Sequence, residues 1–456
     1  MRWKARGVPA VCLSVFLAAV FCVRSHAQQY GEAKISRLDR QSAALMLHNI
    51  HDALRKNYYD PTFHGIDIDA KYKQSEDLLN NASTLSEAMD DISAYLGGLN
   101  DSHTYFVPPV ATRRMDYGFR MRMIGEQCLV TQLRAASDAA SKLQPGDEIL
   151  AVDGRVVNRR TFAGVQRYIN TLAAQKALEV SIRNAQSGER SELKLEGAAE
   201  VRSAAEIAID STASEIRSMT NPATSELLQE RWMEFGHSVL VWKMPWFGIE
   251  PADIDSMMHK AAKDSTLVLD LRGNPGGPIE DLAYITGWFF HHDVTIATPI
   301  GRRRMKAVVA KPHHGAFEGK LIVLVDSASA SASELFARVM QIEHRGIVVG
   351  DRTAGAVMES RLFFFHFGIA PAIHYQAAIT RADLLMSDGK SLEGAGVLPD
   401  VLMNPDAADI AARRDPILAR AVQMAGLNLS AEEAGKFAPF EWAPAQEKNR
   451  AASAGN

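Results

Sequence analysis

The segment from Leu321 to Met340 carries the strongest signal for chemistry. An apolar run leads into a turn of small residues, and an amphipathic helical pattern starts at Ser331. Such a turn presents a hydroxyl at a helix N-terminus, where unpaired N–H groups, here that of Ala332, favour a developing oxyanion. Ser331 and Glu334 also have the spacing of a capping box, in which the serine only caps the helix. The segment alone leaves both interpretations open.

A second turn of the same kind could complete a site. The apolar run 267–271 is followed by Arg-Gly-Asn-Pro-Gly-Gly, which ends at Gly277. Glycines allow a backbone to approach a ligand closely, and the N–H groups of Gly276 and Gly277 could donate to an oxyanion beside Ala332. Ligand sites in alternating α/β sheets gather beyond the carboxyl ends of the strands. Both turns are expected there.

A hydroxyl nucleophile needs a base, and the base needs an orienting group. His103 is the candidate base, because it follows a helix end in a polar loop that offers no packing reason for a histidine. Its local sequence alone predicts that Glu393 is a carboxylate in a turn. Lys390 is an alternative base if burial lowers its pKa. Sequence spacing cannot show which of these reaches Ser331.

The N-terminal residues differ from the rest of the chain. Within residues 1–27, Arg2, Lys4 and Arg6 precede an apolar run, which is followed by a small-x-small pattern that ends at Ala27. This predicts a secretory signal peptide and an exported protein, either periplasmic or secreted. A membrane anchor and a lipoprotein formed through Cys22 are the alternatives. Cleavage would leave Cys128 as the last cysteine, in a stretch typical of a buried strand, and would exclude an internal disulfide.

Four further segments are expected to position the candidate residues. Residues 28–106 repeat apolar side chains at helical spacing, which predicts a helical domain. Residues 107–200 alternate in short stretches between turns, which predicts a β-rich module. Residues 201–427 alternate strands with helices, which predicts an α/β core with partly parallel strands. Residues 428–456 predict a flexible tail. The strand candidates of the core are 238–242, 267–271, 321–325 and 346–349, and its helix candidates are 251–263, 278–290 and 331–342.

Composition limits the partners. The 456 residues have 47% hydrophobic content, which is enough for two or three packed domains. The formal net charge is -4, so no broad basic field is available for a nucleic-acid backbone. Nucleic acid is therefore not expected as a partner. No clustered Cys and His ligands point to a metal, and no cofactor is predicted.

Four motifs in a fixed order resemble those of the tail-specific (C-terminal processing) serine peptidase family. The motifs are 269–277, 329–334, 350–355 and 393–400. The resemblance implies that Ser331, which precedes Ala-Ser-Glu, is the nucleophile of an acyl-enzyme mechanism. It also implies an α/β core similar to the ββα fold of Clp protease and crotonase, with an N-terminal helical domain and an inserted β-rich PDZ-like domain.

The chain departs from this family at one position. Bacterial members use a Ser-Lys dyad whose lysine follows the motif at 350–355, but Ala356 stands here. Another branch, similar to the tricorn core protease and the interphotoreceptor retinoid-binding protein repeats, carries Ser-His near the helical domain and a later Glu. Ser102, His103 and Glu393 match that pattern. The resemblance implies a Ser331, His103 and Glu393 constellation, in which Glu393 holds the imidazole directly or acts through Ser102.

The stretch 117–120, together with 143–154, resembles a PDZ domain. Such domains capture a C-terminal carboxylate through backbone N–H groups of a loop while the peptide adds a strand to the sheet. The resemblance implies that Gly118, Phe119 and Arg120 bind substrate. A simple hairpin turn is the alternative for residues 143–154.

Two functions from different classes fit these observations. The first is an exported endopeptidase that cleaves proteins or peptides after docking a C-terminal segment. The second is a catalytically inactive peptide- or lipid-binding protein, because relatives of the fold bind apolar small molecules and the missing lysine could mark a dead site. The intact set of Ser331, His103 and Glu393 favours the enzyme, since these groups work as a unit.

Overall fold

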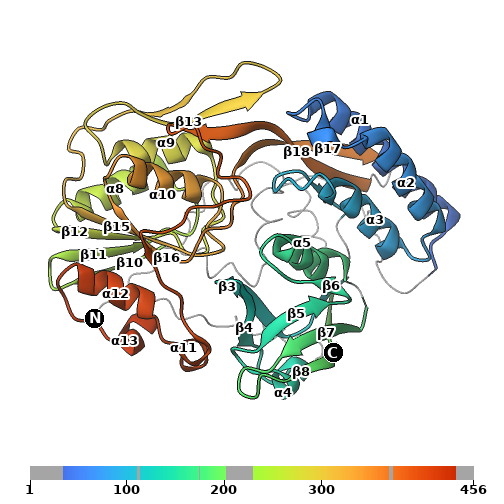
Figure 1. Cartoon of the computed structure of the whole chain (residues 1–456), viewed down its shortest axis with the longest axis horizontal. Coiled ribbons are helices and arrows are strands. Elements are labelled where there is room, and N and C mark those ends of the chain that lie inside the picture. The colour runs from blue at the N-terminus through green and yellow to red at the C-terminus, as the bar shows by residue number, and fades with distance from the viewer. Residues whose placement is uncertain (1–33, 110–112, 174, 202–229, 369–372, 438–456) are drawn as a thin grey trace, which may run out of the picture.

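The computed structural model describes residues 34–109, 113–173, 175–201, 230–368 and 373–437. The expected signal peptide lies outside the described residues, as does most of the polar stretch before residue 230. Within these ranges no helix combines the length and the apolar character that a bilayer span requires. Figure 1 shows three parts: a group of N-terminal helices, a β-rich module and a larger α/β core.

Three helices form the N-terminal part. They are α1 (Arg37–Asn57), α2 (Ile68–Asn81) and α3 (Leu85–Gly97). Each begins at a polar cap whose side chain accepts a backbone N–H of the first turn: Ser36, Asp67 and Thr84. Their apolar faces pack together, with Leu47 and Ile92 fully buried. The helical periodicity of this region is thus a buried stripe.

The central sheet of the core has six strands. Their order is β10 (Arg231–Phe235), β11 (Val239–Lys243), β12 (Thr266–Asp270), β15 (Lys320–Val325), β16 (Ile347–Gly350) and β19 (Val401–Leu402). β10 pairs with β11 in the antiparallel sense, and the other neighbours are parallel. The predicted α/β core with partly parallel strands is confirmed.

Helices cover both faces of this sheet. α8 (Pro251–Ala261), α9 (Ile279–Gly287) and α10 (Ala332–Ile342) pack on the face that carries Leu240 and Leu269. α12 (Pro416–Met424) packs on the other face, against Val241 and Val268. Strands covered on both sides read as continuous apolar runs, which explains why they stood out in the sequence. A short helix, α11 (Ala407–Ala412), precedes α12.

The region from residue 428 is more ordered than expected. It forms α13 (Ala431–Gly435), which begins at the cap Ser430. Phe437 is 1% exposed and belongs to the apolar cluster under α12. The prediction of a flexible tail from residue 428 is therefore wrong up to residue 437, because this aromatic side chain anchors the segment. The remaining tail lies outside the described residues.

A second, antiparallel sheet was not anticipated from the sequence. It contains β1 (Tyr105–Val107), β13 (Val294–Gly301), β14 (Val308–Ala310), β17 (Met358–Phe367) and β18 (Ile373–Met386). β18 pairs with β1 and β17 along its first part and with β13 near its end. Tyr375 packs on the N-terminal helices, whereas Met386 joins the core cluster. β18 therefore ties the helical part to the core (Figure 1).

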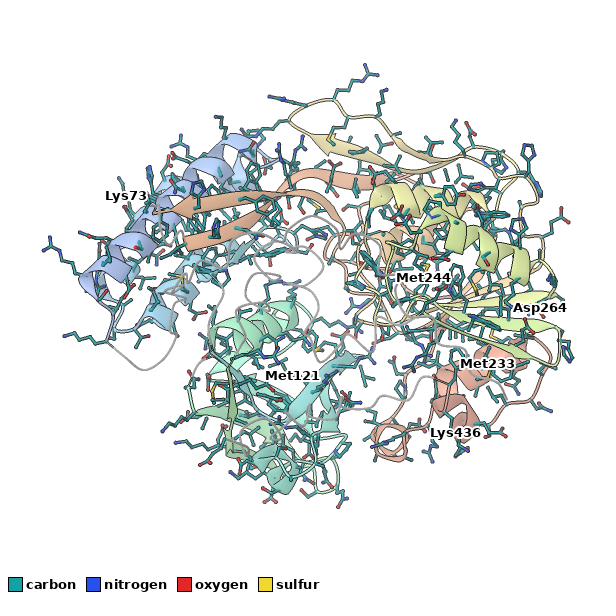
Figure 2. The ribbon with its side chains drawn as sticks, turned by 180° about the vertical axis from the view of Figure 1, so that it is seen from behind. Lys73, Met121, Met233, Met244, Asp264 and Lys436 are labelled. Carbon is teal, nitrogen blue, oxygen red and sulfur yellow. The ribbon has the colours of Figure 1, made fainter. Side chains whose placement is uncertain are left out.

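The β-rich module is inserted between the helices and the core. Its strands are β3 (Phe119–Ile124), β4 (Gln127–Leu133), β5 (Glu148–Val152), β6 (Arg155–Val156), β7 (Ala177–Arg183) and β8 (Arg190–Glu196). Its helices are α4 (Asp138–Lys142) and α5 (Phe162–Arg167), and β2 (Arg113–Asp116) pairs with β9 (Ala198–Val201) beside it. Met121 of β3, labelled in Figure 2, and Cys128 of β4 are buried in its core.

Candidate active site

Ser331 occupies a strained position between β15 and α10. Its φ of 55° and ψ of -117° lie outside the regions that a non-glycine residue prefers. Its backbone N–H donates to the Ala356 carbonyl oxygen at 2.9 Å and to Glu334 Oε2 at 3.1 Å. Such conformations persist only where surrounding contacts over-determine them, and they concentrate at functional sites. The side chain is half-buried rather than enclosed.

Glu334 is a fully buried carboxylate that holds this turn. It accepts the Thr353 hydroxyl and three backbone N–H groups, from Ser331, Gly355 and Ala356. Burial raises its pKa to about 7, against the lowering effect of these donors. Of the predicted capping box, the hydrogen bond from the Ser331 N–H to the Glu334 side chain is thus present. Its main effect is to clamp the Ser331 backbone to the segment 353–356, so a capping role and a functional hydroxyl are compatible.

The glycine-rich turn packs directly on the serine turn. A Cβ atom at Gly276 would lie 2.7 Å from Ser331 Cβ, so only glycine fits there. The Gly276 N–H is already bound, because it donates to Asn274 Oδ1 at 2.9 Å. The N–H groups of Gly277 and Ala332 have no hydrogen-bond partner among the described residues. The structure therefore removes Gly276 from the predicted oxyanion donors and leaves Gly277 and Ala332.

A hydrogen-bonded relay connects Glu393, Ser102 and His103. The Ser102 Oγ lies 2.8 Å from Glu393 Oε2 and 2.7 Å from His103 Nδ1. A carboxylate only accepts, so the Ser102 hydroxyl donates to Glu393 and accepts the Nδ1 proton of His103. His103 Nε2 then carries no proton and can accept one. Glu393 is connected to the imidazole through Ser102, which is one of the two expected arrangements.

Burial controls the charge of the imidazole. His103 is 8% exposed, and burial lowers its pKa to about 4, with a further lowering by the Arg167 charge and an opposing effect of Asp101. The ring is therefore neutral near pH 7, as a general base must be. Burial raises the pKa of Glu393, while the Ser102 and Val357 donors oppose this shift.

One short segment connects the relay with the serine turn. The Val357 N–H donates to Glu393 Oε2 at 2.8 Å, and the neighbouring Ala356 carbonyl accepts the Ser331 N–H at 2.9 Å. The Gly394 N–H donates to the Gly355 carbonyl at 2.8 Å. The segment 355–357, which includes Ala356, thus contributes backbone contacts to both halves of the site.

Sequence reasoning missed the groups that hold His103 in place. Asp101 Oδ1 accepts the His103 backbone N–H at 2.9 Å and the Thr380 hydroxyl at 2.7 Å. Thr380 lies on β18, next to the β1 strand that follows His103. No local pattern could have paired residues 279 positions apart. The one local signal was Asp101, a carboxylate close enough in sequence to bind the His103 backbone.

The two other candidate groups are excluded by their surroundings. Lys390 is exposed in the turn that follows β18, where its backbone N–H donates to Asp388 Oδ1. It is not desolvated, so the condition for a lysine base is not met. Cys128 is buried in β4, and burial raises the pKa of its thiol, which opposes thiolate chemistry as expected.

The loop at Gly118, which was predicted to bind a peptide carboxylate, already binds the side-chain carboxylate of Asp116. The Gly118 N–H donates to Asp116 Oδ1 at 2.8 Å, and the other Asp116 oxygen pairs with Arg134 at 2.8 Å. Phe119 and Arg120 are the first residues of β3, which is an edge strand of its sheet. A peptide carboxylate would therefore have to share or displace the Asp116 contact. The strand edge itself suits peptide addition.

Polar contacts dock the module on both neighbouring parts. Arg159 donates to Asp351 Oδ2 at 2.8 Å, and the same oxygen accepts the Gly125 N–H at 2.8 Å. Arg155 pairs with Asp90 of α3. The Ser327 hydroxyl, four residues before Ser331, donates to the Met123 carbonyl of β3. The module therefore touches the serine turn directly.

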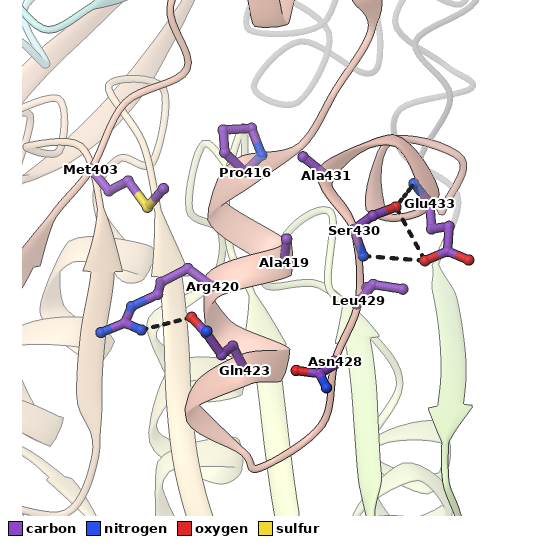
Figure 3. A pocket seen from close by; sticks show the side chains of 10 residues that line it. All are labelled: Met403, Pro416, Ala419, Arg420, Gln423, Asn428, Leu429, Ser430, Ala431 and Glu433. Carbon is purple, nitrogen blue, oxygen red and sulfur yellow. Dashed lines mark hydrogen bonds between the residues drawn. The ribbon is translucent and has the colours of Figure 1, made fainter.

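A hollow between α12 and α13 carries none of the candidate groups. Figure 3 shows its lining, which includes Met403, Leu429 and Arg420, with Arg420 donating to Gln423 at 2.8 Å. It lies beside the helices on the sheet face opposite to α10. The candidate active site is elsewhere, at the carboxyl ends of β12 and β15.

Comparison with known proteins finds a family model that matches the core of the chain. Residues 239–403 match the model of peptidase family S41, and this range includes Ser331, both turns and Glu393. We refer to this matched range, which is similar to peptidase family S41, as the S41 domain. The S41 domain does not include Ser102 and His103, which come from the N-terminal part of the chain. Its serine-type peptidase class agrees with the predicted family.

Curated relatives extend beyond the S41 domain. The tail-specific protease of Haemophilus influenzae is 24% identical over 358 residues, which cover 74% of this chain and 49% of that protein. The chloroplastic carboxyl-terminal-processing peptidase 3 of Arabidopsis thaliana is 22% identical, covering 76% and 66% of the two chains. A probable CtpA-like serine protease of Staphylococcus aureus is 22% identical, covering 88% and 73%. The chain thus spans about half of the first relative and two thirds of the second.

A solved structure supports the fold. Mature CPAF in complex with lactacystin aligns with a TM-score of 0.59 at 15% identity, covering 82% of this chain and 96% of that one. This likeness concerns the fold alone.

Proposed function

We propose that the protein is an exported serine endopeptidase that cleaves proteins or peptides through an acyl-enzyme on Ser331. His103 is the general base, and Ser102 and Glu393 orient it. The Gly277 and Ala332 N–H groups stabilise the oxyanion. The proposal places the chain closer to the Ser-His-Glu branch of the family than to the Ser-Lys branch, since Ala356 replaces the lysine.

The observation that carries the proposal is the relay from Glu393 through Ser102 to His103. Its two hydrogen bonds, of 2.8 and 2.7 Å, set the tautomer that a general base requires. Burying a carboxylate, a hydroxyl and an imidazole costs free energy, which favours a functional role for these three groups. Its connection to Ser331 through residues 355–357 argues for one site rather than two unrelated clusters.

The chemistry begins with attack on a peptide carbonyl. As Ser331 Oγ bonds to the carbonyl carbon, His103 Nε2 takes the hydroxyl proton. The imidazolium is stabilised by Glu393 through the Ser102 hydroxyl. The negative charge that forms on the carbonyl oxygen is bound by the free N–H groups at the start of α10 and at Gly277, in a preorganised low-dielectric setting.

Collapse of this intermediate breaks the C–N bond. His103 then gives its proton to the leaving amine, and an ester on Ser331 remains. A water molecule attacks this ester while His103 takes one of its protons. Cleavage of the bond to Ser331 Oγ, with return of the proton to that oxygen, releases the new carboxyl end of the product.

Substrate docking is assigned to the PDZ-like module. The open edge of β3 and the loop at Gly118, Phe119 and Arg120 suit a C-terminal peptide segment, with Asp116 as a competitor for the loop. Direct contact of β3 with the turn before Ser331 would place a docked chain near the nucleophile. Export follows from the basic, apolar and small-x-small pattern of residues 1–27.

Reaction with a fluorophosphonate probe tests the proposal. The purified protein should be labelled at Ser331, as mapped by peptide mass spectrometry. Ser331→Ala and His103→Ala should abolish labelling, and Glu393→Gln should slow it strongly. A folded protein that stays unlabelled would contradict the enzyme and favour the alternative, a binding protein on the same fold, to be tested with peptides and lipids.

A further inference from the structure

The loop between β13 and β14 concentrates positive charge. Arg302, Arg303, Arg304 and Lys306 are all exposed. No acidic residue occurs from Gly301 to Phe317, although the whole chain has a formal net charge of -4. Four cations within five residues thus form a local field that the overall composition conceals. We call these four residues the basic tip.

The basic tip has no ionic partner among the described residues. Lys311, on the far side of β14, pairs with Asp293, and Arg345 donates to three backbone carbonyls. None of the four tip residues makes a comparable described contact. Their guanidinium and ammonium groups are therefore available to a ligand without breaking existing interactions.

Strand pairing fixes the base of the basic tip. β13 pairs with β18 up to Gly301, opposite Ala382, and with β14 near its start. A Cβ at Gly301 would lie 2.2 Å from the Arg381 carbonyl oxygen, so the strand is packed closely at the base of the loop. Ile300, just before the tip, is 50% exposed. An apolar side chain therefore stands beside the four cations.

The tip lies on the side of the molecule away from the PDZ-like module. Figure 1 shows β13 and the loop after it along one edge, and strands β3 to β8 along the opposite edge. In Figure 2 long side chains that end in nitrogen extend from this edge into solvent. If the basic tip bound a large surface, the PDZ-like module on the opposite edge would remain accessible to substrates.

We propose that the basic tip docks the protein on a membrane surface that contains anionic phospholipid. Arginine matches phosphate oxygens with two parallel hydrogen bonds, and clustered cations are attracted to anionic headgroups. Ile300 can enter the headgroup region beside them. Nucleic acid fits less well, because it needs a longer basic surface than one loop provides. This inference does not depend on the proposed peptidase activity.

Vesicle binding tests the docking. Protein purified after export is mixed with vesicles of phosphatidylcholine alone, or with about one third phosphatidylglycerol, and sedimented. Binding is expected to the second kind only, and to be lost as salt rises to about 0.5 M, where the Debye length is only a few ångströms. The variant R302Q/R303Q/R304Q should bind about a hundredfold more weakly, since each cation contributes roughly fivefold.

A charge-matched variant provides the control. K56Q/K73Q/K263Q removes the same charge from exposed positions elsewhere and should bind as the unchanged protein does. Both triple variants should keep their thermal unfolding midpoint and their reaction with the serine probe. Equal loss in both variants would overturn the proposal, as would absence of binding to anionic vesicles. Binding to polyglutamate or DNA as tight as to vesicles would overturn the assignment to lipid.

Discussion

At the scale of residues, the proposed base, His103, depends on Ser102. This serine stands between Glu393 and His103, and its hydroxyl is both donor and acceptor. Ser102→Ala should lower kcat about ten- to hundredfold with little change in KM, as loss of an orienting partner usually does. Ser102→Thr keeps the hydroxyl and should restore most of the rate. A Thr variant as slow as the Ala variant, with intact folding, would argue against the relay.

The pH dependence of acylation is a second expectation at this scale. His103 must be unprotonated to act, and its pKa is lowered to about 4 by burial. The rate of probe labelling should therefore stay near its plateau at pH 6 and fall through an inflection near pH 4. Since the unfolded imidazole titrates near 6.5, the free energy of unfolding should also decrease as pH falls from 6.5 towards 4. An inflection at 6.5 would contradict the buried, neutral ring.

At the scale of elements, two strand-to-helix turns must fit against each other. Gly276 has a φ of 103°, and a side chain there would meet Ser331 Cβ and the Ala332 N–H. Gly276→Ala should abolish probe labelling by pushing the two turns apart. Gly154→Ala is the matched control, because Gly154 also has positive φ, 73°, but open space around it. It should cost about 1 kcal/mol of stability and keep labelling.

β18 explains how distant segments meet at one site. This strand carries Thr380 beside Asp101 and ends near the turn that leads to Glu393. Its partner β1 directly follows His103. The helical part is thus positioned by a strand of the second sheet. The proposed base, His103, comes from outside the S41 domain, which holds the proposed nucleophile, Ser331.

At the scale of the whole molecule, Arg159 fastens the inserted β-rich module to the core. Its side chain is 12% exposed and pairs with Asp351, which is 6% exposed. Arg159→Ala would leave this carboxylate buried with fewer partners and should weaken docking by about 2–3 kcal/mol. Faster hydrogen exchange at Gly125, whose N–H donates to Asp351, would report the loss. Arg160→Ala, an exposed neighbour, should leave exchange unchanged.

Much of the architecture followed from the sequence because the relevant forces are local. The strands 238–242, 267–271, 321–325 and 346–349 were predicted within one or two residues, since continuous apolar runs between turns mark strands covered on both faces. The second sheet escaped prediction, because β18 packs on two different cores along its length and pairs with segments far apart in the sequence.

The sequence by itself determined the types of residue available for chemistry and their order: a serine before a helix, a glycine-rich turn, a Ser-His pair and a late glutamate. Only the tertiary structure decided their connections. It removed Gly276 as a donor, left Lys390 exposed and routed Glu393 through Ser102. Hydrogen bonds across nearly 300 residues depend on strand pairing and on the packing of separate elements. Local patterns carry no information about which distant donor reaches which acceptor.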